Sequence, residues 1–165
     1  IQFLNSLGYL VVRLGRHNDK RLPTNDASLA YVEINELDSA NQSIADFQVV
    51  EDCSFLISTG SGMDCIALFY RKPVLYINLL SVASHPETHL CPIGVLPTYF
   101  DKSRSIKLDF KDICIEPIRS AGTSSLRKLN IEIQPKDPYY ILQSVKMFIN
   151  FQSKNAVYRK KKLLY

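Results

Sequence analysis

The feature that most constrains the fold is a short turn of threonine, serine and glycine between an apolar run and a helical stretch. The apolar run covers residues 54–58, the turn is Thr59-Gly60-Ser61-Gly62, and the helical stretch covers residues 63–70. Pro73 ends that stretch, and a second apolar run follows at residues 74–78. A strand, a helix and a strand joined by such short connections predict parallel strands with a right-handed crossover.

The remaining chain before the turn follows the same α/β pattern. Residues 8–15 form a β-branched run that ends in glycine, and residues 29–34 predict another strand. Residues 43–51 predict a helix capped by Ser43. Its apolar face is expected to contain Ile44, Phe47 and Val50.

After the second apolar run the pattern weakens. Four prolines interrupt residues 79–122, which predicts loops and short helices with one strand-like segment at residues 105–110. Pro138 suits a first helical turn, and residues 140–151 predict an amphipathic helix. The apolar residues of this helix at helical spacing are Ile141, Val145, Phe148 and Ile149.

A turn of this composition at the start of a helix can hold an anion. Backbone N–H groups and the positive end of the helix converge there, and the hydroxyls of Thr59 and Ser61 add hydrogen bonds. Gly60 and Gly62 allow a close approach of the backbone. The turn has neither the Gly-Lys-Ser/Thr of a Walker A loop nor the spacing of a dinucleotide fingerprint, which argues against ATP and NAD. The alternative is an ordinary tight turn without a ligand.

Arg13 lies at the end of a predicted strand, where open α/β sheets gather their ligands, so its guanidinium is expected to assist in binding phosphate. The alternative is a structural pairing of Arg13 with Asp46 or Asp64. The following loop, with Gly15 and His17, is a further candidate for contacts with the ligand, although a solvated basic loop is the simpler interpretation.

Asn78 and His85, after the second strand of the turn motif, are candidates for contact with a substrate or a nucleotide. His85, His89 and Cys91 contain zinc-ligating groups, but Pro86 argues against a helix that presents both histidines. We therefore expect no metal site. None of the four cysteines forms a C-x-x-C pair, which predicts reduced, structural thiols.

Several segments together resemble the donor-binding domain of GT-B glycosyltransferases. Residues 55–64, then Ala67-Leu68-Phe69 and Lys72-Pro73-Val74-Leu75, are similar to the strand, turn, helix and strand that hold the diphosphate of a nucleotide sugar in that family. Residues 8–15 resemble a strand found in a bacterial group linked to surface-polysaccharide synthesis. Weaker similarities follow in Leu22-Pro23, Ala45-Asp46-Phe47, Asn78 and residues 130–133.

The sequence departs from the family at two positions. Many GT-B enzymes carry a glutamate on the helix after the turn to hold the ribose, and the nearest acid here is Asp64. Relatives often carry glycine where this chain has Arg71. The first departure implies that Asp64, a candidate contact to the donor or acceptor, has a different role or that the ribose is held elsewhere. The second is expected to affect the loop and not the site.

The resemblance implies a Rossmann-like parallel sheet with flanking helices, the C-terminal half of a GT-B fold. With 165 residues we expect one such domain over residues 1–153, followed by a basic tail over residues 154–165. The first ten residues look like the end of a helix leading into a strand, and the chain starts without Met, so the natural N-terminus and an N-terminal domain are expected to be missing.

The implied activity is transfer of a sugar from a nucleotide donor to a glycan or lipid-linked acceptor, without a cofactor. The general base would come from the missing N-terminal domain, so the fragment alone is expected to be inactive. Two alternatives are a non-catalytic nucleotide- or sugar-binding domain and half of a sugar-nucleotide epimerase. The base, sugar, acceptor, stereochemical outcome and oligomeric state are not predicted.

The basic tail dominates the charge of the chain. Five of its residues are Lys or Arg, against a net charge of +4 for the whole chain, so the remainder is slightly acidic. The tail predicts a solvated end, with contact to an anionic membrane surface as the second interpretation, and the lack of interleaved aromatic residues argues against nucleic acid. No stretch is long and apolar enough to cross a bilayer, which predicts a cytoplasmic location, peripheral at the inner membrane face if the tail binds lipid.

Overall fold

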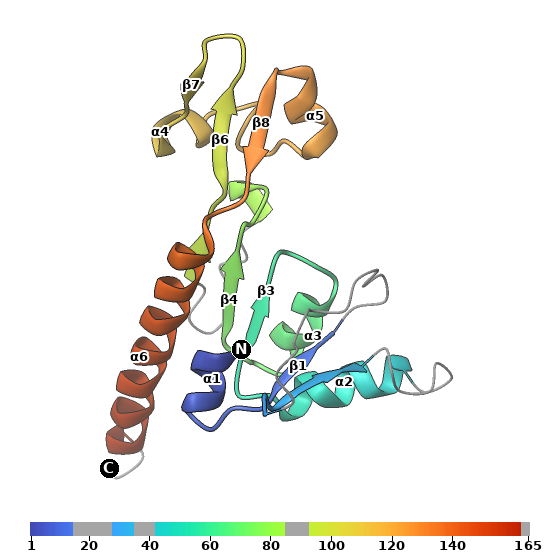
Figure 1. Cartoon of the computed structure of the whole chain (residues 1–165), viewed down its shortest axis with the longest axis vertical. Helices are drawn as coiled ribbons and strands as arrows, with labels where there is room; N and C mark the ends of the chain where they lie inside the picture. The colour runs from blue at the N-terminus through green and yellow to red at the C-terminus, as the bar shows by residue number, and fades with distance from the viewer. Residues whose placement is uncertain (15–27, 35–41, 85–92, 163–165) are drawn as a thin grey trace. The chain divides into compact units, whose positions relative to one another are not determined.

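The computed structural model describes residues 1–14, 28–34, 42–84 and 93–162 (Figure 1). It is a mixed α/β structure with small parallel sheets and helices packed against them, and it divides into two compact units, Ile1–Cys53 and Ser54–Tyr165. The expected α/β class with parallel strands is therefore confirmed. The expectation of one domain over residues 1–153 stays a prediction.

The first unit contains helix α1 (Gln2–Ser6), strands β1 (Val11–Arg13) and β2 (Tyr31–Glu33), and helix α2 (Gln42–Asp52). The two strands are parallel, with Val11 opposite Tyr31 and Arg13 opposite Glu33. The Asn5 side chain joins α1 to this sheet, because its Nδ2 donates to the carbonyls of Tyr9 at 2.8 Å and Ala30 at 3.0 Å. The helix and both strands predicted in this unit are confirmed, but Ser43 is the second residue of α2 and not its cap.

The predicted apolar face of α2 is wrong. Val50 is buried, but Ile44 and Phe47 are 68% and 51% exposed. The other buried residue of the helix is Asp46, four positions before Val50, so the two lie on one face. Asp46 thus occupies a buried position, whereas hydrophobic spacing predicted that Ile44 and Phe47 would be buried.

The second unit begins with the predicted strand–turn–helix–strand motif. Strand β3 (Leu56–Ser58) leads into helix α3 (Met63–Phe69), strand β4 (Val74–Ile77) and the short helix η2 (Val82–Ser84). Strand β5 (Ile93–Val95) completes a parallel sheet in the order β3-β4-β5. In β4, the first three residues are buried, as expected for the central strand of a covered parallel sheet.

A three-stranded antiparallel sheet follows, in the order β7-β6-β8 (Figure 1). It consists of β6 (Thr98–Asp101), β7 (Ile106–Lys107) and β8 (Ile131–Gln134), with helices α4 (Phe110–Ile113) and α5 (Thr123–Lys128) between β7 and β8. The prediction of loops before residue 105 is wrong here. Pro97 lies between β5 and β6, where the chain leaves one sheet for the other, so it separates two strands without preventing either.

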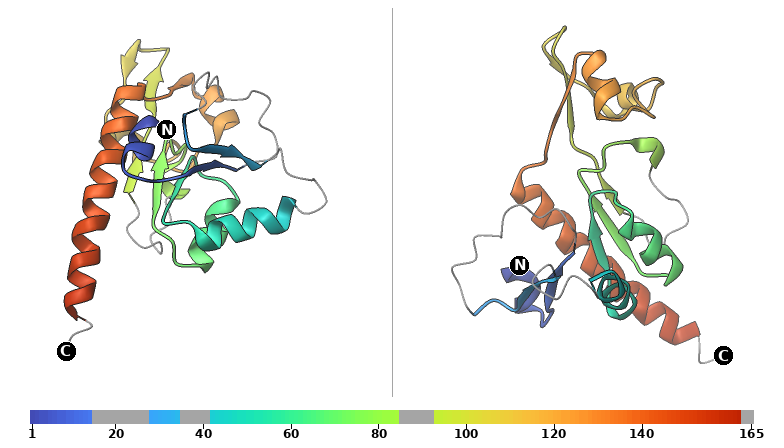
Figure 2. Two further views of the ribbon diagram at one scale, coloured as in Figure 1. Left: turned by 60° about the horizontal axis from the view of Figure 1, so that its bottom comes forward. Right: turned by 90° about the vertical axis from the view of Figure 1, so that its right-hand side faces the viewer.

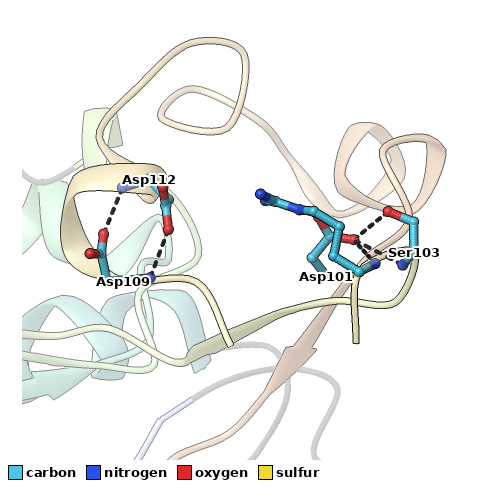
Figure 3. A network of polar contacts seen from close by, with 5 residues as sticks. Asp101, Ser103, Asp109 and Asp112 are labelled. Atoms are coloured by element: carbon cyan, nitrogen blue, oxygen red, sulfur yellow. Dashed lines mark hydrogen bonds and ion pairs between the residues drawn. The ribbon is translucent and has the colours of Figure 1, made fainter. Parts of the chain in front are cut away.

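The antiparallel sheet has its own apolar core and a polar turn. The core residues are Tyr99, Leu108, Ile113, Ala121, Leu126 and Ile131. In the turn between β6 and β7, Oδ1 of Asp101 accepts hydrogen bonds from the Ser103 amide at 2.9 Å and its hydroxyl at 2.5 Å (Figure 3). Oδ2 of Asp101 accepts from Arg104 Nε at 2.7 Å. These hydrogen bonds, first from the Ser103 hydroxyl and then from Arg104, lower the pKa of Asp101 far below its usual range.

Helix α6 (Pro138–Lys162) is one unbroken helix in both views of Figure 2 and contacts β4 and β5. Val145 and Phe148 are buried, with Ile141 and Ile149 half-buried, so the predicted apolar face is confirmed. The Phe148 ring contacts Phe55 edge-on, with centroids 5.4 Å apart. The helix continues past residue 154, where the separate basic tail was expected to begin, and ends at Lys162. No helix among the described residues has the length and apolar character to span a membrane.

Candidate functional site

The Thr59–Gly62 turn lies at the carboxyl end of β3, where parallel α/β sheets bind ligands. All four residues of the turn are exposed. The Gly60 amide donates to Oγ of Ser58 at 3.1 Å, and Gly60 has a φ of 90°, which favours glycine. A Cβ at Gly60 would meet Cδ1 of Leu79 at 2.8 Å. Gly60 is therefore required by the conformation of the turn itself.

Gly62 has a different environment. It is the N-cap of α3 with ordinary helical angles, φ −58° and ψ −23°, and a Cβ there would meet no atom within 4 Å. The backbone conformation does not require glycine at this position. The space around Gly62 is open to a ligand. A larger side chain at this position would block that space without a clash inside the chain.

Asp64 holds the turn from within. Its Oδ2 accepts the Ser61 amide at 2.8 Å, and the residue is only 8% exposed. Its Oδ1 is also buried and accepts no hydrogen bond from the residues that the structure describes. This carboxylate therefore accepts the hydrogen bond from one of the N–H donors that the sequence assigned to a ligand. It also places a negative charge beside the turn.

Tyr76 in β4 extends this buried polar cluster. Burial raises the pKa of its hydroxyl well above the usual range, and the charges of Asp64 and Cys65 raise it further. The Tyr76 hydroxyl is thus neutral at neutral pH. It lies beside Ser58 in the register of β3 and β4.

The N–H groups that remain for a ligand are those of Gly62 and Met63, for which the described part of the chain supplies no hydrogen-bond acceptor. The hydroxyls of Thr59 and Ser61 are exposed beside them. Two adjacent amides and two hydroxyls can bind the oxygens of a phosphate group. The turn thus has donors for an anion, although the amides of Gly60 and Ser61 are already engaged within the chain.

Asn78 follows β4 and has a structural role that the sequence did not indicate. Its φ of 52° is in the left-handed region, which asparagine tolerates better than most residues. Its Oδ1 accepts the Lys136 amide at 2.8 Å, across 58 residues of sequence. Lys136 therefore lies at the carboxyl edge of the parallel sheet, and no local motif predicts it there. The expected contact of Asn78 with a ligand stays a prediction.

Arg13 belongs to the first unit and pairs there with Glu33. Its Nη1 lies 3.2 Å from Oε1 of Glu33, which also accepts the Tyr31 hydroxyl at 2.6 Å. Arg13 thus forms a structural ion pair, but its partner is Glu33 and not the expected Asp46 or Asp64. Its role in binding phosphate stays a prediction.

The other candidates from the sequence lie outside the described residues, namely Gly15, His17, His85, His89 and Cys91. Within the ranges that the structure describes, no group of three or more His, Cys, Asp or Glu residues could hold a metal ion. Cys53, Cys65 and Cys114 are free thiols, of which Cys65 is exposed.

We compared the chain with protein-family models, with curated proteins and with solved structures, and none of them matches it.

Proposed function

We propose that the Thr59–Gly62 turn binds the diphosphate of a nucleotide sugar and that the chain is the donor-binding part of a bacterial glycosyltransferase. The observation that carries the proposal is the exposed turn at the carboxyl end of β3, with the Gly62 and Met63 amides available to a ligand. The resemblance of the β3–α3–β4 sequence to the GT-B donor site supports the same ligand. In this proposal the β3-β4-β5 sheet belongs to a Rossmann-like, C-terminal GT-B half.

The chemistry of sugar transfer fits the donors of the turn. A nucleoside diphosphate gains negative charge as it leaves the sugar, and fixed N–H dipoles and hydroxyls directed at its oxygens stabilise that charge. The acceptor would be a glycan or a lipid-linked sugar in surface-polysaccharide synthesis. A general base from another domain would deprotonate its hydroxyl.

Asp64 sets a limit on this site. Since its carboxylate is buried and bound to the Ser61 amide, it is not directed at a ribose, and its charge opposes a diphosphate. Asp64→Asn keeps an oxygen that can accept the Ser61 amide and removes the charge. We expect this variant to bind the nucleotide more tightly, by about twofold to tenfold for an interaction of about 1 kcal/mol.

The Asp64 geometry also favours a second candidate function, a binding domain without catalysis. A turn that uses two of its amides internally and lacks the family's ribose-binding acid would retain weak affinity for phosphate groups and no transferase activity. Nucleotide binding that does not distinguish a nucleotide sugar from inorganic pyrophosphate would favour this candidate.

Titration calorimetry of the full chain against UDP, GDP, CDP and their sugars tests the proposal. Gly62→Val fills the open space at the turn, and Gly122→Val is the matched control, because a Cβ at Gly122 also meets no atom within 4 Å and the residue is also a helix N-cap. We expect saturable binding of one nucleotide, weakened at least about tenfold by Gly62→Val and unchanged by Gly122→Val. The absence of binding by the folded chain, or equal binding by both variants, would contradict the proposal.

A further inference from the structure

An open pocket lies where the chain passes from the parallel to the antiparallel sheet of the second unit. Its volume is about 650 Å³, within the range of sites for small molecules. The end of β5, the start of β6 and the segment leading into α4 line it. The buried side chains of Tyr99, Leu108 and Ile113 supply apolar surface, and the largely exposed ring of Phe110 also lines the pocket.

Two lysines line the same pocket. Nζ of Lys136 donates to Oγ1 of Thr98 at 3.2 Å, which leaves two of its three N–H groups for another acceptor. Partial burial lowers the pKa of Lys136, and the charge of Lys107 lowers it further. Both lysines line the pocket, so an anion bound there would face two positive charges and reduce their mutual repulsion.

The remaining charged group of the lining is already engaged. Asp109 caps α4, and its Oδ1 accepts the Asp112 amide at 3.0 Å, while its own amide donates to Asp112 Oδ2 at 3.1 Å (Figure 3). The lining thus contains two lysines and one aspartate, which is an excess of positive charge. The backbone of Lys136 is fixed by its hydrogen bond to Asn78 at 2.8 Å.

We propose that this pocket binds a phosphate ester that carries an apolar or aromatic group. The phosphate lies on Lys107, Lys136 and the Thr98 hydroxyl, and the apolar group lies on Leu108 and Phe110. Two ammonium groups and a hydroxyl match the several oxygens of a phosphate, and the apolar lining predicts a preference for an ester over the free ion. This site is separate from the Thr59–Gly62 turn and does not depend on its function.

The test is an NMR titration of the ¹⁵N-labelled full chain with phenyl phosphate, with inorganic phosphate and benzyl alcohol as comparison ligands. We expect saturable shifts of the amides of residues 98, 99 and 108, and at least about tenfold weaker binding of either comparison ligand. Lys136→Gln should weaken the binding of phenyl phosphate at least about tenfold, because it removes a charged hydrogen-bond donor.

Two control variants make the result specific. Lys128→Gln removes an exposed lysine of α5 that does not line the pocket, and it should leave the affinity unchanged. Gly62→Val should also leave it unchanged, which separates this site from the proposed nucleotide site. The inference is overturned if phenyl phosphate causes no saturable shifts at the pocket, if Lys136→Gln binds as well as the parent chain, or if benzyl alcohol binds equally.

Discussion

Gly60 and Gly62 are two residues apart, and the backbone requires glycine only at the first. Gly60 has a positive φ and a neighbouring Leu79 methyl group, whereas Gly62 has helical angles and open space. We expect Gly60→Ala to lower the free energy of unfolding by about 1–2 kcal/mol. Gly62→Ala should leave it unchanged or raise it by up to about 1 kcal/mol, since alanine restricts the unfolded chain. Urea denaturation measures both, and an equal loss in the two variants would contradict this assignment.

Asp101 predicts a dependence of stability on pH. Its hydrogen bonds to Ser103 and Arg104 hold the pKa in the folded chain below that of the unfolded chain. The stabilisation is therefore fully present above pH about 4, the usual pKa of aspartate, and is lost as the pH falls below it. Asp101→Asn should be less stable than the parent chain at pH 7, and the difference should shrink below pH about 4. Thermal unfolding across this pH range measures it, and a constant difference would contradict the assigned role.

At the scale of elements, the end of α3 has a left-handed residue that is not glycine. The amides of Arg71 and Lys72 donate to the carbonyls of Leu68 at 3.0 Å and Ala67 at 2.8 Å, the hydrogen bonds of a Schellman motif. Arg71 has a φ of 52° at the position that usually carries glycine. A glycine at this position would adopt the same conformation without strain.

Replacing this residue should stabilise the chain. We expect Arg71→Gly to raise the free energy of unfolding by up to about 1 kcal/mol, because it removes left-handed strain. Arg127→Gly in the last turn of α5 is the control and should lower it by about 0.5–1 kcal/mol, the usual cost of glycine in a helix. A destabilised Arg71→Gly variant in chemical denaturation would show that the side chain contributes more than the strain costs.

Helix α6 provides a second prediction at this scale. Phe148 is fully buried and contacts Phe55, whereas its neighbour Met147 is 69% exposed. Phe148→Ala should lower the free energy of unfolding by about 3–5 kcal/mol, and Met147→Ala by less than about 0.5 kcal/mol. Chemical denaturation compares the two, and similar losses would mean that α6 does not present this face to the core.

The elements differ in how far the sequence predicts them. Hydrophobic spacing is sufficient for α6, whose buried residues Val145 and Phe148 are apolar, and for β4, whose first three residues are buried. In β3 and α3 the buried residues include Ser58 and Asp64, so the glycine turn between the two apolar runs is the stronger signal there.

Hydrophobic spacing is misleading for α2, where Asp46 is buried and Phe47 is exposed. Strands β5 and β6 are not predicted from the sequence, because each is only three or four residues long and Pro97 lies between them.

At the scale of the whole molecule, the class of the fold follows from the alternation of strands and helices, but the antiparallel β7-β6-β8 sheet does not. The turn of the candidate site is predictable because its four residues are consecutive in the sequence. The hydrogen bond from the Lys136 amide to the Asn78 side chain joins residues 58 positions apart. The pocket that contains Lys107 also depends on tertiary packing. No spacing in the sequence encodes such contacts.

The most direct test of the account is an NMR titration of the full chain with the nucleoside diphosphate that binds best by calorimetry. We predict that the amide resonances of Gly62 and Met63 show the largest shifts and saturate together, while those of Gly122 and Thr123 at the start of α5 do not move. Saturable binding with the largest shifts elsewhere, or no binding by the folded chain, would contradict the proposal that the turn after β3 holds a diphosphate.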